Sequence, residues 1–347
     1  MADQEEEDFQ LEESEELFEH HRIVTDPAQN PLRIDKFLMD RLPNTSRNKL
    51  QLAAKSGYIM VNGKVVKSNY KVKPGDVVTV ELPHPVREIK LIPEDIPLNI
   101  VYEDDHLIVI NKQAGIVVHP GYGNYSGTLV NGLIHHFDQL PANTQHGIPR
   151  PGLVHRLDKL TTGLMVIGKT EEAMMKLSEQ FFERTTERRY TALVWGDMDE
   201  DGTVTGHLGR SLKDRKVMTV FPDEDYGKHA VTHYKVLKKL RYVTLVECKL
   251  ETGRTHQIRV HMKYIKHPLF GDAEYGGDKI LKGTTFSKYR QFVTNCFNGL
   301  NRQALHARTL GFTHPSTGER MQFTSDLPED MLWVIDRWEK YMEQHNA

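Results

Sequence analysis

The stretch GLVHRLDKLTTGLMVIGK, residues 152–169, places a short polar segment between two apolar ones. Its second half, TGLMVIGK at 162–169, has the aliphatic and β-branched content of a buried strand. The polar segment contains His155, Arg156 and Asp158. Charged side chains between apolar runs are partly buried, and a buried charge requires a partner or a chemical task. A structural ion pair and a reactive carboxylate both fit this segment.

Strand-like segments surround this stretch and outnumber the helical ones. Helices are predicted over 126–136, over 170–184 with Thr170 as N-cap, and over 255–265. Because strands do not alternate regularly with helices, we predict an α+β fold with a mixed or antiparallel sheet. The predicted strands are 106–111, 115–119, 162–169, 189–196, 233–240 and 242–250, with a hairpin of 308–313 and 320–324.

The segment 31–83 is predicted to form a small α/β module of its own. A helix is expected over Leu32–Asp40, Ser46 is a candidate N-cap for the next helix, and Asn62-Gly63 is a strong hairpin signal. Residues 33–82 contain ten Lys or Arg and four acids, an excess that indicates either phosphate contacts or a solvated charged face.

The charge of the chain is unevenly distributed. Residues 1–19 contain ten acids and no Lys or Arg, so the formal net charge of −3 leaves +7 on the remainder. We predict a disordered acidic tail over 1–30, which acts either as a solubilising extension or as an RNA mimic. Four prolines in 83–97 predict a linker over 84–97, followed by one large domain over 98–347.

Several protein classes are excluded by composition and motifs. No stretch has the roughly 20 apolar residues of a membrane span, and no secretory signal begins the chain. Two cysteines, Cys248 and Cys296, supply neither a disulfide scaffold nor a four-cysteine zinc site, and we expect a cytoplasmic protein without a metal. Phosphate-binding loops and dinucleotide fingerprints are missing from the sequence, so no nucleotide cofactor is predicted.

A second polar cluster follows the predicted strand 242–250. The segment TGRTHQIRVH, residues 252–261, contains five polar side chains of the kind that bind a phosphate or hold a catalytic carboxylate. A solvated helix start is the structural alternative. The five side chains are Arg254, His256, Gln257, Arg259 and His261.

Three segments in register resemble the motifs of the RluA-type pseudouridine synthases. They read HRLDKLTTGLMVIGK, RRYTALVWG and TGRTHQIRVH. YEDDHLIVINKQAGIVVHP is similar to the lead-in motif of that family, and THPSTGERMQFTSDLP to its C-terminal hairpin. One departure is Lys112-Gln113-Ala114-Gly115, where the family usually has Lys-Pro-x-Gly. Within the N-terminal module, RIDKFL, SRNKLQLAAKSGYIMVNG and KVKPGDVVTV resemble the RNA-binding module of ribosomal protein S-four.

The resemblance covers residues 32 to about 340 and implies a reaction that uses no cofactor. Uracil is detached from the ribose of an RNA uridine, rotated, and rejoined through carbon 5. Asp158 would act at the sugar as nucleophile or base, with Arg259, or alternatively Arg254, keeping it ionised. Tyr190 would hold the loose uracil, and its hydroxyl would be available for proton transfer.

RNA contacts are also implied by the resemblance. Arg156, with His155 beside it, would fill the gap that a flipped uridine leaves. Lys112 and His119 would line the same groove. The implied RNA is large-subunit ribosomal RNA or a pre-ribosomal particle, and the protein is expected to be a monomer. Candidate contacts to the RNA backbone in the N-terminal module are Arg33, Lys36, Arg47, Lys49 and Lys64.

Two other readings remain open at this point. A catalytically silent ribosome-assembly factor would use the same RNA-binding surfaces, but it has no reason to retain Asp158, Tyr190 and Arg259 together. A glycosidase built on Asp158 would need a second carboxylate as acid or base. No second acid lies inside the three motif segments.

Overall fold

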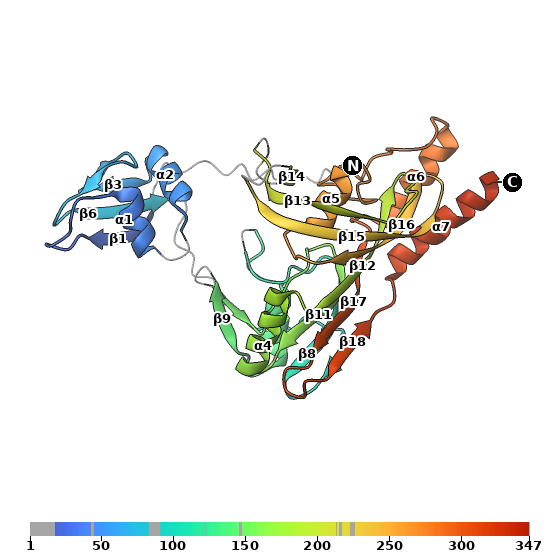
Figure 1. Ribbon diagram of the computed structural model, residues 1–347, viewed down its shortest axis with the longest axis horizontal. Coiled ribbons are helices and arrows are strands. Elements are labelled where there is room, and N and C mark those ends of the chain that lie inside the picture. The colour runs from blue at the N-terminus through green and yellow to red at the C-terminus, as the bar shows by residue number, and fades with distance from the viewer. Residues whose placement is uncertain are drawn as a thin grey trace, which may run out of the picture. The chain divides into compact units, whose positions relative to one another are not determined.

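The structure, a computed structural model, describes residues 18–42, 45–82, 91–121, 123–145, 148–212, 214, 217–222 and 226–346 (Figure 1). The chain divides into two compact units, one of Met1–Lys90 with Thr144–Ile148 and one of Leu91–Asn143 with Pro149–Ala347. Each unit has its own hydrophobic core.

The first unit packs two helices on a four-stranded sheet of order β1-β6-β3-β4. Its core contains Ile34, Phe37 and Leu38, each fully buried. The predicted N-cap is confirmed, because the Ser46 hydroxyl accepts a hydrogen bond from the Lys49 amide. The elements are β1 (Phe18–Val24), β2 (Leu32–Arg33), α1 (Ile34–Arg41), α2 (Arg47–Lys55), β3 (Ile59–Val61), β4 (Lys64–Val65), β5 (Lys71–Val72) and β6 (Val77–Leu82).

The predicted hairpin at Asn62-Gly63 joins β3 to β4. Both residues have positive φ, 52° and 74°, as a tight hairpin turn requires. The predicted tail is wrong in one part, because Phe18–Val24 forms β1 and pairs antiparallel with β6. Ile23 of β1 packs on the core, which offsets the cost of ordering this segment. The acidic run before Phe18 lies outside the described residues.

The second unit is built on a ten-stranded sheet of order β14-β13-β15-β16-β12-β17-β11-β8-β7, with β18 on β17 (Figure 1). Neighbouring strands are antiparallel except for β11 and β17, so the predicted mixed α+β fold is confirmed. The elements are β7 (Ile100–Glu103), β8 (Leu107–Lys112), α3 (Leu129–His136), β9 (Ala142–Gln145), β10 (Ile148–Pro151), β11 (Thr162–Gly168), α4 (Glu171–Glu183), β12 (Glu187–Trp195), β13 (Gly202–Arg210), β14 (Met218–Phe221), β15 (Lys228–Lys239), β16 (Val243–Leu250), α5 (Gln257–Tyr264), α6 (Ser287–Gly299), β17 (Leu305–Thr313), β18 (Arg320–Thr324) and α7 (Glu329–Asn346).

Both faces of this sheet are covered, which explains the unbroken apolar runs of its central strands. On one face, Tyr190 and Met165 pack with Ile258 of α5. On the other face, Leu193 and Trp195 pack with α6 and α7, while Leu164 and Val166 pack with α4. Successive side chains of β11 and β12 therefore point into different cores.

The parallel pair β11–β17 depends on a glycine. Gly163 has φ of 122°, and a Cβ there would lie 2.3 Å from the Ala307 carbonyl oxygen. No other residue type fits this approach. Because Gly163 lies five residues after Asp158, the same contact fixes where the polar segment ends.

The strand predicted over 115–119 is wrong. Gly115 has φ of 87°, and the carbonyls of Val117 and Val118 accept hydrogen bonds from Leu129 and Val130 at the start of α3. The segment therefore caps a helix instead of joining the sheet. In the predicted linker, 91–97 forms no regular element but packs on α3, where Asn131 donates to the Ile92 carbonyl.

Candidate active site

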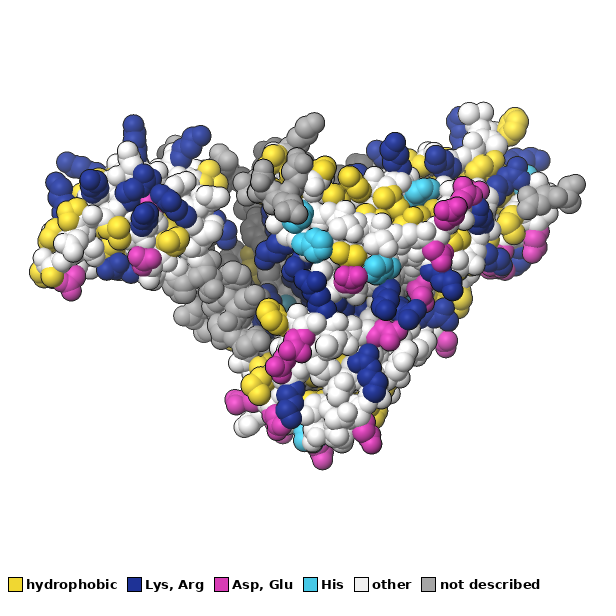
Figure 2. Space-filling view, in the orientation of Figure 1, with side chains coloured by type: hydrophobic (Ala, Val, Ile, Leu, Met, Phe, Trp, Pro, Cys, Tyr) yellow, Lys and Arg dark blue, Asp and Glu magenta, His cyan; other side chains and the backbone are white. Residues whose placement is uncertain are grey.

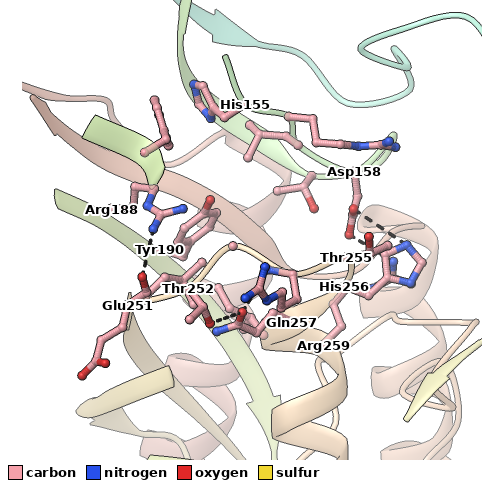
Figure 3. A pocket seen from close by; sticks show the side chains of 18 of the residues that line it. His155, Asp158, Arg188, Tyr190, Glu251, Thr252, Thr255, His256, Gln257 and Arg259 are labelled. Carbon is pink, nitrogen blue, oxygen red and sulfur yellow. Dashed lines mark hydrogen bonds and ion pairs between the residues drawn. The ribbon is translucent and has the colours of Figure 1, made fainter. Parts of the chain in front are cut away.

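A cavity of about 370 Å³ opens in the second unit, where the two polar clusters of the sequence meet. One wall comes from the segment between β10 and β11, and another from the segment between β16 and α5. The third wall combines the end of α4 with the start of β12. Figure 3 shows Asp158 pointing toward His256, with Arg188 and Tyr190 on a different side of the cavity.

Asp158 lies on the β10–β11 segment and keeps one fifth of its side chain exposed. Its Oδ2 accepts a hydrogen bond from Arg259 Nη1 at 3.2 Å, and its Oδ1 lies 3.7 Å from His256 Nε2. Its backbone carbonyl accepts the Thr161 amide, which closes a turn after it. The carboxylate is therefore anchored from one side and open to the cavity on the other.

Arg259 of α5 is the centre of the charge network. Its Nε and Nη2 donate to both oxygens of Asp272 at 2.7 and 2.8 Å, and Nη2 also donates to Glu274 at 2.8 Å. Burial opposes its charge, but the hydrogen bonds and charges of Asp272, Asp158 and Glu274 outweigh burial and raise the pKa of Arg259. The guanidinium therefore stays charged and rigid beside Asp158.

His256 completes the contacts around Asp158 from the N-cap position of α5, where φ is 55°. Its Nδ1 lies 2.8 Å from the Tyr275 hydroxyl and 3.5 Å from Glu274. Burial lowers the pKa of this imidazole, against the opposing effect of the Asp158 charge.

The segment before α5 is held by one amide side chain. Gln257 Oε1 accepts from the Thr252 hydroxyl and the Arg254 amide, while its Nε2 donates to the Val231 carbonyl. Arg254 lines the cavity, but its Nε donates to the His229 carbonyl. Of the two cations predicted for Asp158, the structure brings Arg259 to it.

Tyr190 of β12 lies in the hydrophobic core, lines the cavity and is 9% exposed. Burial raises the pKa of its phenol and outweighs the lowering effect of the Arg188 charge, while the Asp158 charge adds a smaller upward shift. At neutral pH the side chain is therefore an uncharged aromatic wall that carries a proton.

His155 has a structural arrangement. Its Nε2 accepts the Val166 amide at 3.0 Å, and its ring stacks on Phe181 at 4.5 Å. Burial lowers its pKa to about 3, so the ring is neutral.

Arg156, in contrast, is exposed at the cavity and forms none of the hydrogen bonds or ion pairs found among the described residues. The structural alternative, in which Arg156 pairs with Asp158, is not what the structure shows.

Lys112 and His119 do not line this cavity, so the prediction that they do is wrong. Lys112 is 3% exposed, and its Nζ donates to the carbonyls of Gln113, Ile116 and Lys159. The ring nitrogens of His119 lie 2.9 and 2.8 Å from the Pro120 and Pro149 carbonyls. Both side chains hold loops, and Lys112 ties the lead-in motif to the residue after Asp158.

In the first unit, two of the predicted RNA contacts, Arg33 and Arg47, also bind a buried aspartate. Asp35 is fully buried and accepts hydrogen bonds from Arg33, Arg47 and Gln51. The pKa of the Asp35 carboxyl is lowered, and the hydrogen bond from Arg33 is the largest cause. The outer edges of both arginines remain exposed, at 39% and 43%. Lys36, Lys49 and Lys64 are exposed on the same unit, whose visible face in Figure 2 is rich in Lys and Arg.

Sequence reasoning missed the segment GDAEYGG at 271–277, which supplies Asp272, Glu274 and Tyr275 to the network. Two acids and a tyrosine between glycines were the available signal. Neither acid is the second carboxylate that the glycosidase alternative requires, because both are bound to Arg259 and neither lines the cavity. Glu251 does line the cavity, but its carboxylate is paired with His233. Among the described residues, no group of three or more metal-ligating side chains is arranged around a common point, and no helix has the length and apolarity of a membrane span.

Comparisons with known proteins identify the family of the chain. The RNA pseudouridylate synthase family matches residues 106–264, and the S4 domain matches 32–78. A protein of Chlorobaculum parvum named "Uncharacterized RNA pseudouridine synthase" is 47% identical over 89% of this chain and 95% of its own. The chain therefore belongs to the RNA pseudouridine synthases, enzymes that isomerise uridine in RNA.

More specific relatives fall in the same family. A Xylella fastidiosa protein named "Ribosomal large subunit pseudouridine synthase D" is 43% identical over 92% of both chains. The solved structure of human RNA pseudouridylate synthase domain containing 4 is 26% identical, covers 69% of this chain and 92% of its own, and has a TM-score of 0.51. The resemblance to the RluA-type family seen in the motifs is thereby confirmed.

Proposed function

We propose that this enzyme converts uridine to pseudouridine in large-subunit ribosomal RNA, with Asp158 acting at the ribose. The observation that carries the proposal is the Asp158 carboxylate, which Arg259 holds on one side and which faces a cavity that Tyr190 also lines. The similarity to proteins named for the large ribosomal subunit supports the RNA class. A monomeric state and a cytoplasmic location stay predictions.

The reaction exchanges one glycosidic bond for another. The bond from C1′ to N1 of uracil breaks, a bond from C1′ to C5 forms, the C5 proton leaves and N1 gains a proton. Asp158 attacks C1′ as a nucleophile or removes a proton at C2′ as a base, and both routes require an ionised carboxylate. Arg259 supplies the fixed positive charge that stabilises this ionised form.

The remaining side chains have the geometry to handle the base. Tyr190 provides the flat apolar surface against which detached uracil turns, and its phenol carries a proton for transfer. Arg156 is exposed at the cavity mouth and long enough to enter the gap left by the flipped uridine. His155 acts through its neighbours as a positioning residue for this segment.

The first unit would hold the RNA by its backbone. Its exposed cations neutralise phosphates without reading sequence, which suits a role in positioning. Arg33 and Arg47 would contact RNA through the edges that Asp35 leaves free, and Lys36, Lys49 and Lys64 as solvated point charges.

Tritium release tests this proposal. Large-subunit ribosomal RNA labelled at uracil C5 is incubated with the wild type, with Asp158→Asn and with the control Asp336→Asn, an exposed acid of α7. We expect release by the wild type and the control but not by Asp158→Asn. No release by the wild type, from naked RNA or from pre-ribosomal particles, would overturn the proposed function.

A further inference from the structure

Arg188 of β12 is a buried arginine that has no carboxylate partner in the part of the chain that the structure describes. It is 8% exposed, and its Nε has no hydrogen-bond acceptor among the described residues. The one hydrogen bond found for its guanidinium is a long one, 3.4 Å from Nη2 to the Glu251 carbonyl. Arginines this deeply buried are normally paired, so the position calls for an anion.

The surroundings of Arg188 contain further positive charge. Arg184, at the end of α4, lines the same cavity and is exposed. Burial lowers the pKa of Arg188 and the Arg184 charge lowers it further, although Tyr190 acts in the opposite sense. The ring of Phe181 lies 5.5 Å from the guanidinium and supports it from one side.

The position of Arg188 relative to the proposed chemistry is set by the strand. Arg188 and Tyr190 are two residues apart on β12, so their side chains leave the same face of the sheet. Both line the cavity, and Figure 3 shows them close together near Glu251. A nucleoside whose base lies against Tyr190 therefore has its own phosphate groups within the reach of the 184–188 segment.

We infer that Arg188, with Arg184, forms a phosphate subsite for the RNA backbone next to the reacting uridine. The guanidinium provides a planar set of donors for phosphate oxygens, and the anion neutralises a charge that the free protein leaves unpaired. The subsite is distinct from Arg156, which lies on the β10–β11 segment. Its assignment to RNA rests on the proposed function, whereas anion binding at Arg188 does not.

Kinetics of Arg188→Gln test the inference against a matched neighbour. Arg189, the next residue, is paired with Glu187 and Glu247 and does not line the cavity, so Arg189→Gln is the control. We expect kcat/KM for RNA to fall about 10- to 100-fold in Arg188→Gln, mainly through KM, and to stay within about 2-fold in Arg189→Gln. Arg188→Lys should recover part of the loss.

A neutral backbone linkage separates phosphate binding from a purely structural role. A synthetic RNA carrying a methylphosphonate on either side of the target uridine should lose activity with the wild type at one of the two positions. In Arg188→Gln, the same methylphosphonate should reduce activity little further, because the contact that it removes is already gone. If the methylphosphonate reduces the activity of Arg188→Gln by the same factor as that of the wild type, the subsite is overturned.

Inorganic phosphate gives a readout that needs no catalysis. The Nε–H signal of Arg188, assigned by its loss in Arg188→Gln, should shift on titration with phosphate in the full-length protein. No shift, together with an unchanged KM in Arg188→Gln, would refute the inference. If the wild type releases no tritium, the proposed function has failed, and the phosphate titration alone decides whether Arg188 binds an anion.

Discussion

Asp35 and Asp158 are both aspartates held by arginine, yet the carboxylate of Asp35 accepts many more hydrogen bonds than that of Asp158. Asp35 is fully buried and accepts hydrogen bonds from two arginines and a glutamine. Asp158 accepts one hydrogen bond, at 3.2 Å, and one fifth of its side chain stays exposed. The first carboxylate has no remaining capacity for a ligand, whereas the second faces a cavity with its lone pairs available.

The comparison extends to the arginines. Arg33 and Arg47 are partly exposed and serve Asp35. Arg259 is buried and divides its donors among Asp272, Glu274 and Asp158, so Asp158 receives a small share of a rigid cation. A reactive carboxylate is thus oriented by a charge whose position other acids determine.

The largest expected effect comes from Asp158→Asn. We expect activity on RNA to fall at least about 1,000-fold, because the variant lacks the group that acts on the sugar. The free energy of unfolding should change by less than about 1 kcal/mol, since Arg259 keeps two other carboxylates. Single-turnover tritium release and thermal unfolding measure the two quantities. A large loss of stability would place Asp158 in the same class as Asp35.

Arg259→Gln should damage both stability and activity. It leaves the buried Asp272 without its cation, and we expect a loss of about 3–5 kcal/mol in the free energy of unfolding. Fluorescence of Trp195, Trp333 and Trp338 reports this, because all three tryptophans of the chain lie in the second unit. Arg259→Lys should retain more stability than Arg259→Gln; equal stability of the two would argue against charge pairing as the cause.

Asp35→Asn should destabilise the first unit by about 2–3 kcal/mol, less than a fully buried pair because Arg33 and Arg47 are partly exposed. Hydrogen exchange of α1 and β6 amides measures the change. The pKa of Asp35 is lowered, so its contribution is present above the pKa of the unfolded chain, near 3.8, and is lost only as pH falls further. Exchange in the first unit that accelerates already between pH 6 and 5 would contradict this.

The second unit should respond to acid earlier. His155 has a folded pKa of about 3 against an ordinary value of 6.5, so the unfolded state binds the proton first and stability falls as pH drops below 6.5. His155→Gln keeps an acceptor for the Val166 amide but does not titrate. At pH 5, its loss of stability relative to pH 7 should be about 2 kcal/mol smaller than that of the wild type. Tryptophan fluorescence in urea measures it; equal losses would refute the role of His155.

The smallest effect is expected for the surface lysines of the first unit. Replacing Lys36, Lys49 and Lys64 by Gln should weaken RNA binding about 10-fold and reduce the salt dependence of log K by about 2 to 3. Replacing Lys235, Lys238 and Lys340, exposed on the second unit, is the control with equal charge change. If the two triple variants weaken RNA binding equally in filter binding, the effect comes from net charge in general, and the first unit has no dedicated RNA-binding face.

Local features of the fold were readable from the sequence. Ser46 and Thr170 cap helices, Asn62-Gly63 turns a hairpin, and the central strands of the large sheet lie where apolar runs predicted them. These signals work because they depend on neighbours within a few residues. Helix α7 was not predicted, although Met331, Val334 and Trp338 have the spacing of one buried helix face.

The sequence by itself determined the residue types of the site. It also determined two of the three segments that form its charge network, the one with Asp158 and the one with Arg259. Tertiary structure alone decided that GDAEYGG supplies the acids for Arg259 and that Lys112 and His119 hold loops. It also decided that Arg188 is buried with no carboxylate bound to it among the described residues. The physical reason is separation along the chain. Asp158 and Arg259 are 101 residues apart, and which donors a carboxylate finds depends on how the sheet brings distant loops together.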